Sequence, residues 1–260
     1  MPAVLAQLEA ANTARPHDPD TVLALGLANL WGVSELARDP SQASAAPTRA
    51  MEAISSLTEA MSLRPGDARV PGWLGGTLIA TGVNANDPAL VAQGQSVLAQ
   101  AVAAFPQFNL FIHALVNQSA PIGSPELASA VDAYFQTLDV CFGTTIDRTN
   151  PDASPFLGLQ TQAGPNRACW DDPLAPYNWE GFFYAMGDTL VRAGQPAVAL
   201  RSYQNATLLP TFATYPFHDE VIDRMSTVAA RAALYTDADP SNDPELVSES
   251  RTQCAACHAR

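Results

Sequence analysis

Small and large apolar residues recur at one spacing near the ends of four segments of the chain. In each segment a small or apolar residue is followed by a larger one four positions later, by an alanine three positions further on, and by a closing proline. The four sets are Val4-Leu8-Ala11-Pro16, Ala53-Leu57-Ala60-Pro65, Gly94-Leu98-Ala101-Pro106 and Ala199-Tyr203-Ala206-Pro210. Residues three and four apart share one face of a helix, and proline stops a helix from continuing. The spacing therefore predicts four helices, each with a face that lets a partner helix approach closely.

The partner helices are indicated by a glycine that directly follows a large residue. The pairs are Leu25-Gly26, Leu74-Gly75 and Met186-Gly187. This arrangement resembles the tetratricopeptide repeat over about residues 3–118 and 177–236, although the closing prolines lie further apart than the roughly 34 residues of that repeat. The resemblance implies a right-handed superhelix of helical hairpins with inserted loops, and an alanine-rich helical bundle is the alternative. Both are all-α, and no strand-like alternation of apolar and polar residues is sustained.

The middle of the chain departs from this pattern. Residues 125–142 are typical of a helix, whereas residues 143–176 are rich in proline, glycine, asparagine and aspartate and have no clear period. A loop of this length in a compact domain is usually functional or disordered. This irregular insertion carries large apolar side chains and runs into an aromatic cluster, so we expect it to pack. The residues concerned are Phe156, Leu157, Leu159, Trp170, Tyr177, Trp179, Phe182, Phe183 and Tyr184.

Two further helices are predicted towards the C-terminal end. Residues 216–235 form the first of them, which is amphipathic. Its expected apolar face consists of Val221, Ile222, Met225, Val228, Ala229 and Ala232. Asp243 and Pro244 are typical of a helix start, so a last helix is expected over residues 244–258. The chain then divides into a helical-repeat domain, residues 1–236, with the irregular insertion at about 143–176, and a C-terminal turn and helix, residues 237–260.

Composition and charge narrow the classes of partner. Hydrophobic residues make up 47% of the chain, which is enough for a full core, and the formal net charge is -13. Such a surface repels nucleic acid and anionic membranes, so a cationic protein partner, or no charged partner at all, fits better. No run of about 18 apolar residues occurs, and we therefore expect no membrane span.

The segment Cys254-Ala255-Ala256-Cys257-His258 has the spacing used for covalent haem attachment. On a helix the two thiols lie about one turn apart. They can then reach the two vinyl groups along one edge of a porphyrin, while the next side chain presents its imidazole to the iron. These five residues resemble the attachment motif of the c-type cytochromes. The resemblance implies one covalent haem c, held through Cys254 and Cys257, with His258 as an axial iron ligand.

A redox-active dithiol, half of a zinc site and a chance match are the alternatives for the same residues. No strand–helix pattern of the thioredoxin type surrounds them, and no second close pair of zinc ligands is present in the sequence. Because Ala259 and Arg260 alone follow the motif in this sequence, we expect upstream helices, a second subunit of a homo-oligomer or solvent to cover the haem. The aromatic cluster is either core packing or one wall of that pocket.

Bacteria attach haem covalently outside the cytoplasmic membrane, so the motif predicts a periplasmic or extracellular location. The N-terminal residues 1–6 do not have the features of a secretory signal, and we expect that such a signal has been removed. A cytosolic protein that never receives haem is the alternative. In an oxidising compartment the two remaining cysteines, Cys141 and Cys169, can pair. Two separate buried thiols are the alternative.

The sixth iron ligand is sought among four histidines and five methionines. A short connection between the two C-terminal helices makes them antiparallel, which brings His218 to the same end as His258. His218 is therefore the first choice as the second axial ligand and Met225 the alternative; an open iron or a ligand from another molecule is also considered. His113 lies in an apolar segment and is expected to be a core histidine, and His17 lies in a polar turn.

Three functions are compatible with these features. The first is electron transfer by a monohaem c-type cytochrome on a helical-repeat scaffold, with a redox protein as partner. The second is a haem oxidoreductase or peroxidase-like enzyme with an open sixth position, for which Arg224, Asp219 and Glu220 are candidate distal groups. The third is a non-haem repeat scaffold that binds peptides and carries a redox or zinc-binding tail.

Overall fold

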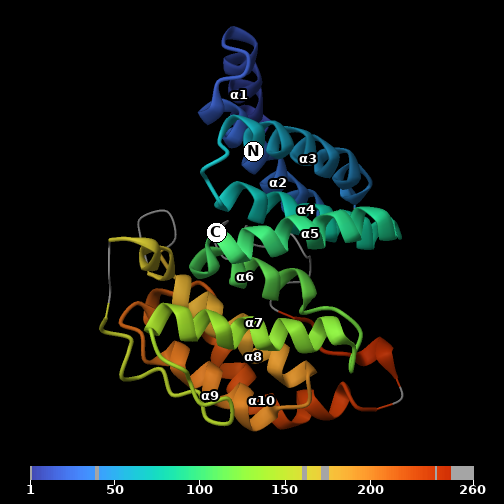
Figure 1. Ribbon diagram of the computed structural model, residues 1–260. Helices are drawn as coiled ribbons and strands as arrows, with labels where there is room; N and C mark the ends of the chain where they lie inside the picture. Colours follow the sequence, from blue (N-terminus) through green and yellow to red (C-terminus); the bar gives the residue numbers. More distant parts are fainter. Residues whose placement is uncertain (1, 39–40, 160–162, 171–175, 238, 247–260) are drawn as a thin grey trace. The chain divides into compact units, whose positions relative to one another are not determined.

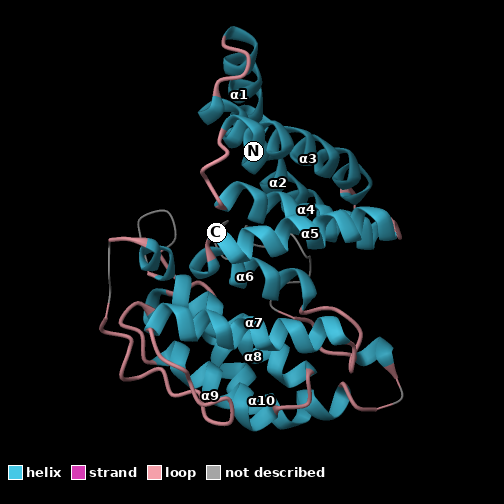
Figure 2. Cartoon of the chain, viewed as in Figure 1, coloured by secondary structure: helices cyan, strands magenta, loops and turns pink. Residues whose placement is uncertain are grey.

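The computed structural model describes residues 2–38, 41–159, 163–170, 176–237 and 239–246. In these parts of the chain the secondary structure consists of ten α-helices and four short 3-10 turns, without a strand, so the fold is all-α as expected (Figure 2). The described helices pack into two compact units, whose boundary in the sequence lies between Ile112 and His113. The boundary between the two units lies within residues 1–236, the range predicted from the sequence as one helical-repeat domain.

The first unit contains five complete helices and the beginning of a sixth (Figure 1). They are α1 (Pro2–Ala14), α2 (Pro19–Arg38), α3 (Ala46–Leu63), α4 (Arg69–Asn84), α5 (Pro88–Ala104) and α6 (Pro106–Asn117). The second unit contains the end of α6 and four further helices. They are α7 (Pro125–Phe142), α8 (Asn178–Arg192), α9 (Pro196–Thr207) and α10 (His218–Leu234).

Three pairs of consecutive helices in the described chain, α2 with α3, α4 with α5, and α8 with α9, form close hairpins. In each pair a glycine of the first helix faces the large residue predicted to fill the gap. A Cβ on Gly26 would lie 3.0 Å from Leu57, one on Gly75 would lie 2.7 Å from the backbone nitrogen of Leu98, and one on Gly187 would overlap the ring of Tyr203. The sequence prediction of tightly packed partner helices is confirmed for these three pairs.

The small residues around each large one are buried, as the spacing requires. Ala53, Leu57 and Ala60 on α3, Leu98 and Ala101 on α5, and Ala199, Tyr203 and Ala206 on α9 are each at most 1% exposed. The first predicted copy differs, because Val4 on α1 is 48% exposed. Helix α1 packs mainly on α2 at the N-terminal end of its unit, so one of its sides faces solvent.

Local signals account for the bounds of α7. The Ser124 side chain accepts a hydrogen bond from the amide of Leu127, and Pro125 occupies the first turn. Gly143 ends the helix with a φ of 69°, a left-handed conformation that favours glycine. The helix therefore has the bounds that the sequence predicts, and α10 begins and ends within two residues of its predicted bounds.

The irregular insertion packs against the second unit, as expected. Asn205 on α9 donates a hydrogen bond to the carbonyl of Pro151 and accepts one from the amide of Ala153. Phe156 stacks on Phe142 at a ring separation of 4.9 Å. These contacts fix the first part of the insertion to α9 and to the end of α7.

Candidate functional site

The haem-attachment residues Cys254, Cys257 and His258 lie outside the described residues. The site that the structure does describe consists of helix α10 and the segment that leads from it towards this motif. Both parts belong to the second unit. They contain the two candidate iron ligands, His218 and Met225, and the last described residues before the motif.

The inner face of α10 differs from the prediction. Val221 is fully buried, but Ile222 is 50% exposed and Ala229 is exposed as well. Arg224 instead points inwards, and its side chain is only 16% exposed. The expected apolar face of α10 is therefore wrong in part. The physical reason is a buried carboxylate on α8 that attracts the Arg224 guanidinium into the unit.

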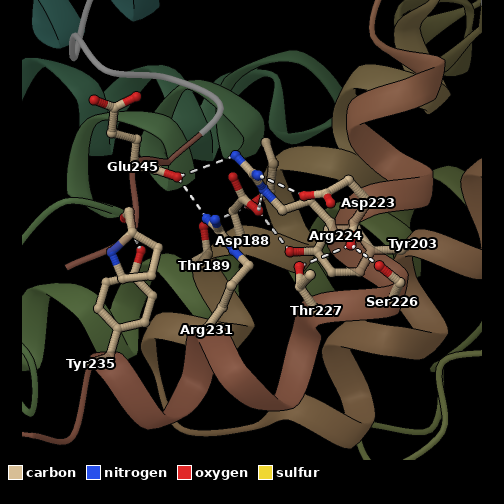
Figure 3. Close-up of polar contacts among 12 residues, drawn as sticks. Asp188, Thr189, Tyr203, Asp223, Arg224, Ser226, Thr227, Arg231, Tyr235 and Glu245 are labelled. Atoms are coloured by element: carbon tan, nitrogen blue, oxygen red, sulfur yellow. Dashed lines mark hydrogen bonds and ion pairs between the residues drawn. The ribbon is translucent and has the colours of Figure 1, made fainter. Parts of the chain in front are cut away.

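This carboxylate belongs to Asp188, whose side chain is fully buried. Figure 3 shows its polar contacts. The Nε atom of Arg224 lies 3.2 Å from its Oδ1 atom, and the hydroxyl of Tyr203 donates a hydrogen bond of 2.6 Å to the same oxygen. Burial, and after it the negative charge of Asp188, raises the pKa of the Tyr203 hydroxyl. Tyr203 thus remains a neutral donor, and the cluster holds a buried charge with an opposite charge beside it.

The segment after α10 is held by main-chain contacts. The Tyr235 hydroxyl donates to the carbonyl of Pro244, and Arg231 and Arg224 donate to the carbonyl of Glu245 over 2.7 and 3.4 Å (Figure 3). Leu246 is buried. Because Tyr235 stands at the end of α10 and Arg224 near its beginning, this segment runs back along the helix.

The expected last helix does not begin at Pro244. Residues 243–246 are not helical, and the remainder of the predicted helix lies outside the described residues. In a first helical turn the carbonyls of residues 244 and 245 would accept hydrogen bonds from amides four residues later. Here Tyr235 and the two arginines occupy those carbonyls. Residues 244–245 do run antiparallel to α10, but as a non-helical segment, and the rest of the expected antiparallel helix lies outside the described residues.

His218 stands in the first turn of α10, and its side chain is 42% exposed. Its Nδ1 atom lies 2.9 Å from the carbonyl of Tyr215, which can only accept a hydrogen bond, so Nδ1 carries the proton. The Nε2 atom lies 3.3 Å from a carboxylate oxygen of Asp219. In the neutral ring, Nε2 carries the lone pair that a metal ion would use, and a metal ion there would replace the contact with Asp219.

Met225 lies on the same face of α10 as His218. The residues at positions 218, 222, 225 and 229 are four, three and four apart, which places them in one row along the helix. Ile222, which is 50% exposed, lies between the two candidate ligands in this row, and the exposed Ala229 follows Met225. We call these four residues the ligand row. Apart from His218 it is apolar, and it is partly open to solvent.

The remaining candidates are placed elsewhere. His113 is half-buried, its Nε2 atom lies 2.8 Å from the Ser129 hydroxyl, and burial lowers its pKa although the charge of Asp132 opposes this. His17 is exposed in a turn beside Glu59. Arg224 faces Asp188, which leaves it unsuited to act as a distal group beside His218. No group of three or more His, Cys, Asp or Glu side chains in the described parts of the chain is arranged to hold a metal ion.

Cys141 and Cys169 form a disulfide, with a Cα–Cα distance of 5.8 Å. Both cysteines are buried. The adjacent Phe142 stacks on Trp179 at 5.0 Å, and Trp170 packs on Trp179 at 5.7 Å. The aromatic residues around the disulfide are buried against one another, as expected of core packing.

Replacement of both cysteines by serine is expected to lower the free energy of unfolding by about 3 kcal/mol, since the disulfide closes a loop with a sequence separation of 28 in the unfolded chain. Urea unfolding of the oxidised protein and of the Cys141→Ser/Cys169→Ser variant measures this difference. Reduction of the wild-type protein in urea should bring its midpoint to that of the variant. Equal midpoints before reduction would contradict the prediction.

The buried cluster was missed at the level of sequence. Asp188 directly follows Met186-Gly187 inside an apolar helix, and a carboxylate at such a position signals a buried pair. Arg224 gives no such signal, because the expected apolar face of its helix leaves it on the solvent side. Neither residue, however, shows from the sequence which partner it has, because the two are 36 positions apart.

None of the helices in the described part of the chain is both long enough and apolar enough to cross a membrane. No protein family, curated protein or solved structure was found that matches this chain.

Proposed function

We propose that this chain is a monohaem c-type cytochrome that transfers electrons, with haem held through Cys254 and Cys257 and with His258 as one axial ligand. The five-residue motif carries the proposal, because its spacing serves thioether attachment and iron ligation together. The haem supplies the redox chemistry when bound. The protein sets its potential through the second axial ligand, burial and hydrogen bonds.

The scaffold of the proposal is tetratricopeptide-like. Its support is the repeated contact of a glycine with one large residue in three hairpins, at Gly26, Gly75 and Gly187. A right-handed superhelix of such hairpins would offer a groove for a partner. With a net charge of -13, a redox protein with a basic surface suits this groove best.

His218 is proposed as the sixth ligand. The hydrogen bond from its Nδ1 atom to Tyr215 orients the ring, and the ligand row gives a porphyrin an apolar surface. From Leu246 to His258 the chain has 12 residues, which span about 18 Å as a helix and about 40 Å when extended. The path from Arg224 back to His218 is six residues of helix, about 9 Å. The motif can therefore reach the ligand row in either conformation.

An oxidising location is part of the proposal. The disulfide between Cys141 and Cys169 supports it, because such bonds persist mainly in secreted and periplasmic proteins. Covalent haem attachment requires the same side of the cytoplasmic membrane. A periplasmic or extracellular protein accounts for both features.

The sixth ligand is tested with variants of the ligand row in protein that was exported together with the haem-attachment machinery. We expect His218→Ala to convert a low-spin spectrum into a high-spin one that binds carbon monoxide in the reduced state. Met225→Leu, a change of similar size in the same row, should leave the spectrum unchanged. Low-spin haem that survives in His218→Ala but not in Met225→Leu would contradict the assignment and select the methionine.

A further inference from the structure

We infer that residues 243–246 form a latch, and that Arg231, Arg224 and Tyr235 are positioning residues that fix where the haem-bearing segment leaves helix α10. The inference rests on the proposed function, because it concerns the placement of haem beside the ligand row. The latch itself is described by contacts that do not involve haem. The existence of these contacts and their effect on the placement of haem can therefore be tested separately.

The latch is held by its main chain. Three side chains donate hydrogen bonds to two consecutive carbonyls. Arg224 and Arg231 of α10 donate to the carbonyl of Glu245, and Tyr235 at the end of α10 donates to that of Pro244. Figure 3 shows that the Glu245 carboxylate points away from both arginines, although its carbonyl contacts them. At its two ends the latch is fixed by side chains, since Asp243 lies 3.8 Å from Arg192 and Leu246 is buried.

Arg231 is set apart from other partly buried arginines by its partners. Arg64 and Arg148 each lie within 4 Å of an aspartate. Among the described residues, the hydrogen bond of Arg231 goes to the Glu245 carbonyl, and its Nε atom is buried without a hydrogen-bond partner. A guanidinium that is buried to this extent costs free energy unless its donors are used. The Glu245 carbonyl is thus the contact that accounts for its position.

Arg224 ties the latch to the core of the α8–α9 hairpin. Its Nε atom is fixed by the buried carboxylate of Asp188, which Tyr203 of α9 also contacts. One of its terminal nitrogens remains for the carbonyl of Glu245. The latch therefore closes on donors that are already in place, so that little conformational entropy is lost when it forms.

The latch runs from the end of α10 towards its beginning, the end at which His218 stands, along a side of the helix about 120° away from the ligand row. A short tether that starts from a fixed point gives the two ligands a higher effective concentration at one iron than a free tether does. A released latch would let the attachment segment move away from the ligand row. Loss of latch contacts should therefore weaken the sixth iron bond without removing haem, because thioether bonds hold the haem independently.

The first measurement needs no haem. A glutamyl endopeptidase cleaves after Glu245 and must itself bind the carbonyl that Arg231 and Arg224 hold. Cleavage then follows the population of the open latch. We expect Arg231→Gln to accelerate cleavage of this bond on the order of tenfold, as the loss of one charged hydrogen bond implies. Tyr235→Phe, which keeps the ring, should have a smaller effect, and Arg231→Lys should stay closest to the wild type.

The second measurement uses the haem-loaded protein. Arg231→Gln should show a larger high-spin fraction and a shifted midpoint potential, and Arg231→Lys should recover most of the wild-type values. Arg148→Gln is the matched control, because Arg148 also donates to a carbonyl, that of Ile146, and pairs with an aspartate. The Arg148→Gln variant should leave the spectrum unchanged. Its cleavage rate after Glu245 should change only as far as its free energy of unfolding, measured in urea, changes.

Each result decides one statement. Unchanged cleavage in Arg231→Gln and Tyr235→Phe would overturn the latch, whatever the haem does. Faster cleavage with an unchanged spin state and potential would overturn the positioning role. A wild-type protein that takes up no haem would overturn the proposed function, and the cleavage rates would still decide whether the latch exists.

Discussion

Gly187→Ala is expected to lower the free energy of unfolding by about 3 kcal/mol. The new methyl group would overlap the ring of Tyr203, with the Cδ1 atom at 2.5 Å. Both residues are in the core of the α8–α9 hairpin, where forcing a ring aside costs about 1–3 kcal/mol. Displacement of the ring also breaks the Tyr203–Asp188 hydrogen bond, which adds about 1.5–3 kcal/mol. The better helix propensity of alanine offsets about 1 kcal/mol of this loss.

Gly32→Ala is the matched control for this substitution. Gly32 lies inside helix α2, and the nearest atom to a Cβ there is Cγ of the flexible Arg49 side chain at 3.3 Å. Urea unfolding should therefore show an unchanged or slightly higher stability for Gly32→Ala. Equal effects of the two substitutions would contradict the close packing of Gly187 on Tyr203.

Arg224→Met is expected to lower the free energy of unfolding by about 3 kcal/mol at pH 7. The substitution keeps the apolar stem but removes the positive charge beside the fully buried Asp188. Removal of one partner of a buried pair costs about 3–5 kcal/mol, because the other charge stays in a low-dielectric environment. The Tyr203 hydroxyl still contacts Asp188, which favours the lower end of this range.

The effect of Arg224→Met depends on pH in a defined direction. Without the guanidinium, the buried Asp188 carboxylate loses the positive charge of Arg224 beside it. Protonation of this carboxylate in acid removes the uncompensated charge and therefore lessens the loss of stability. Urea midpoints of the variant should approach those of the wild type on acidification. The double variant Arg224→Met/Asp188→Asn should lose this pH dependence, and its persistence would contradict the account.

The hairpins could be predicted from the sequence because their signal is local. A glycine on one helix and a large residue among small ones on the next define the contact, as at Gly75 and Leu98. The helix over residues 125–142 could be predicted to the residue for the same reason. Ser124, Pro125 and Gly143 are all start and stop signals that act within a few positions.

The faces of α10 could not be predicted in this way. Charged residues are normally assigned to the solvent side of an amphipathic helix, and the pattern places Arg224 there. Its partner Asp188 belongs to another helix, and a single sequence does not show which helices meet. The error over a helix start at Pro244 has a similar origin. Local capping residues are present, but donors from α10 take the carbonyls that the first turn would use.

The central claim is that Cys254 and Cys257 carry one haem, and one measurement tests it most directly. The protein is exported together with the haem-attachment machinery, purified, and examined by intact mass and by its dithionite-reduced absorption spectrum. The account predicts a mass increase of one haem and a reduced α-band, both absent in the Cys254→Ser/Cys257→Ser variant. A wild-type mass equal to that of the polypeptide alone, with no α-band or with bound zinc, would contradict it.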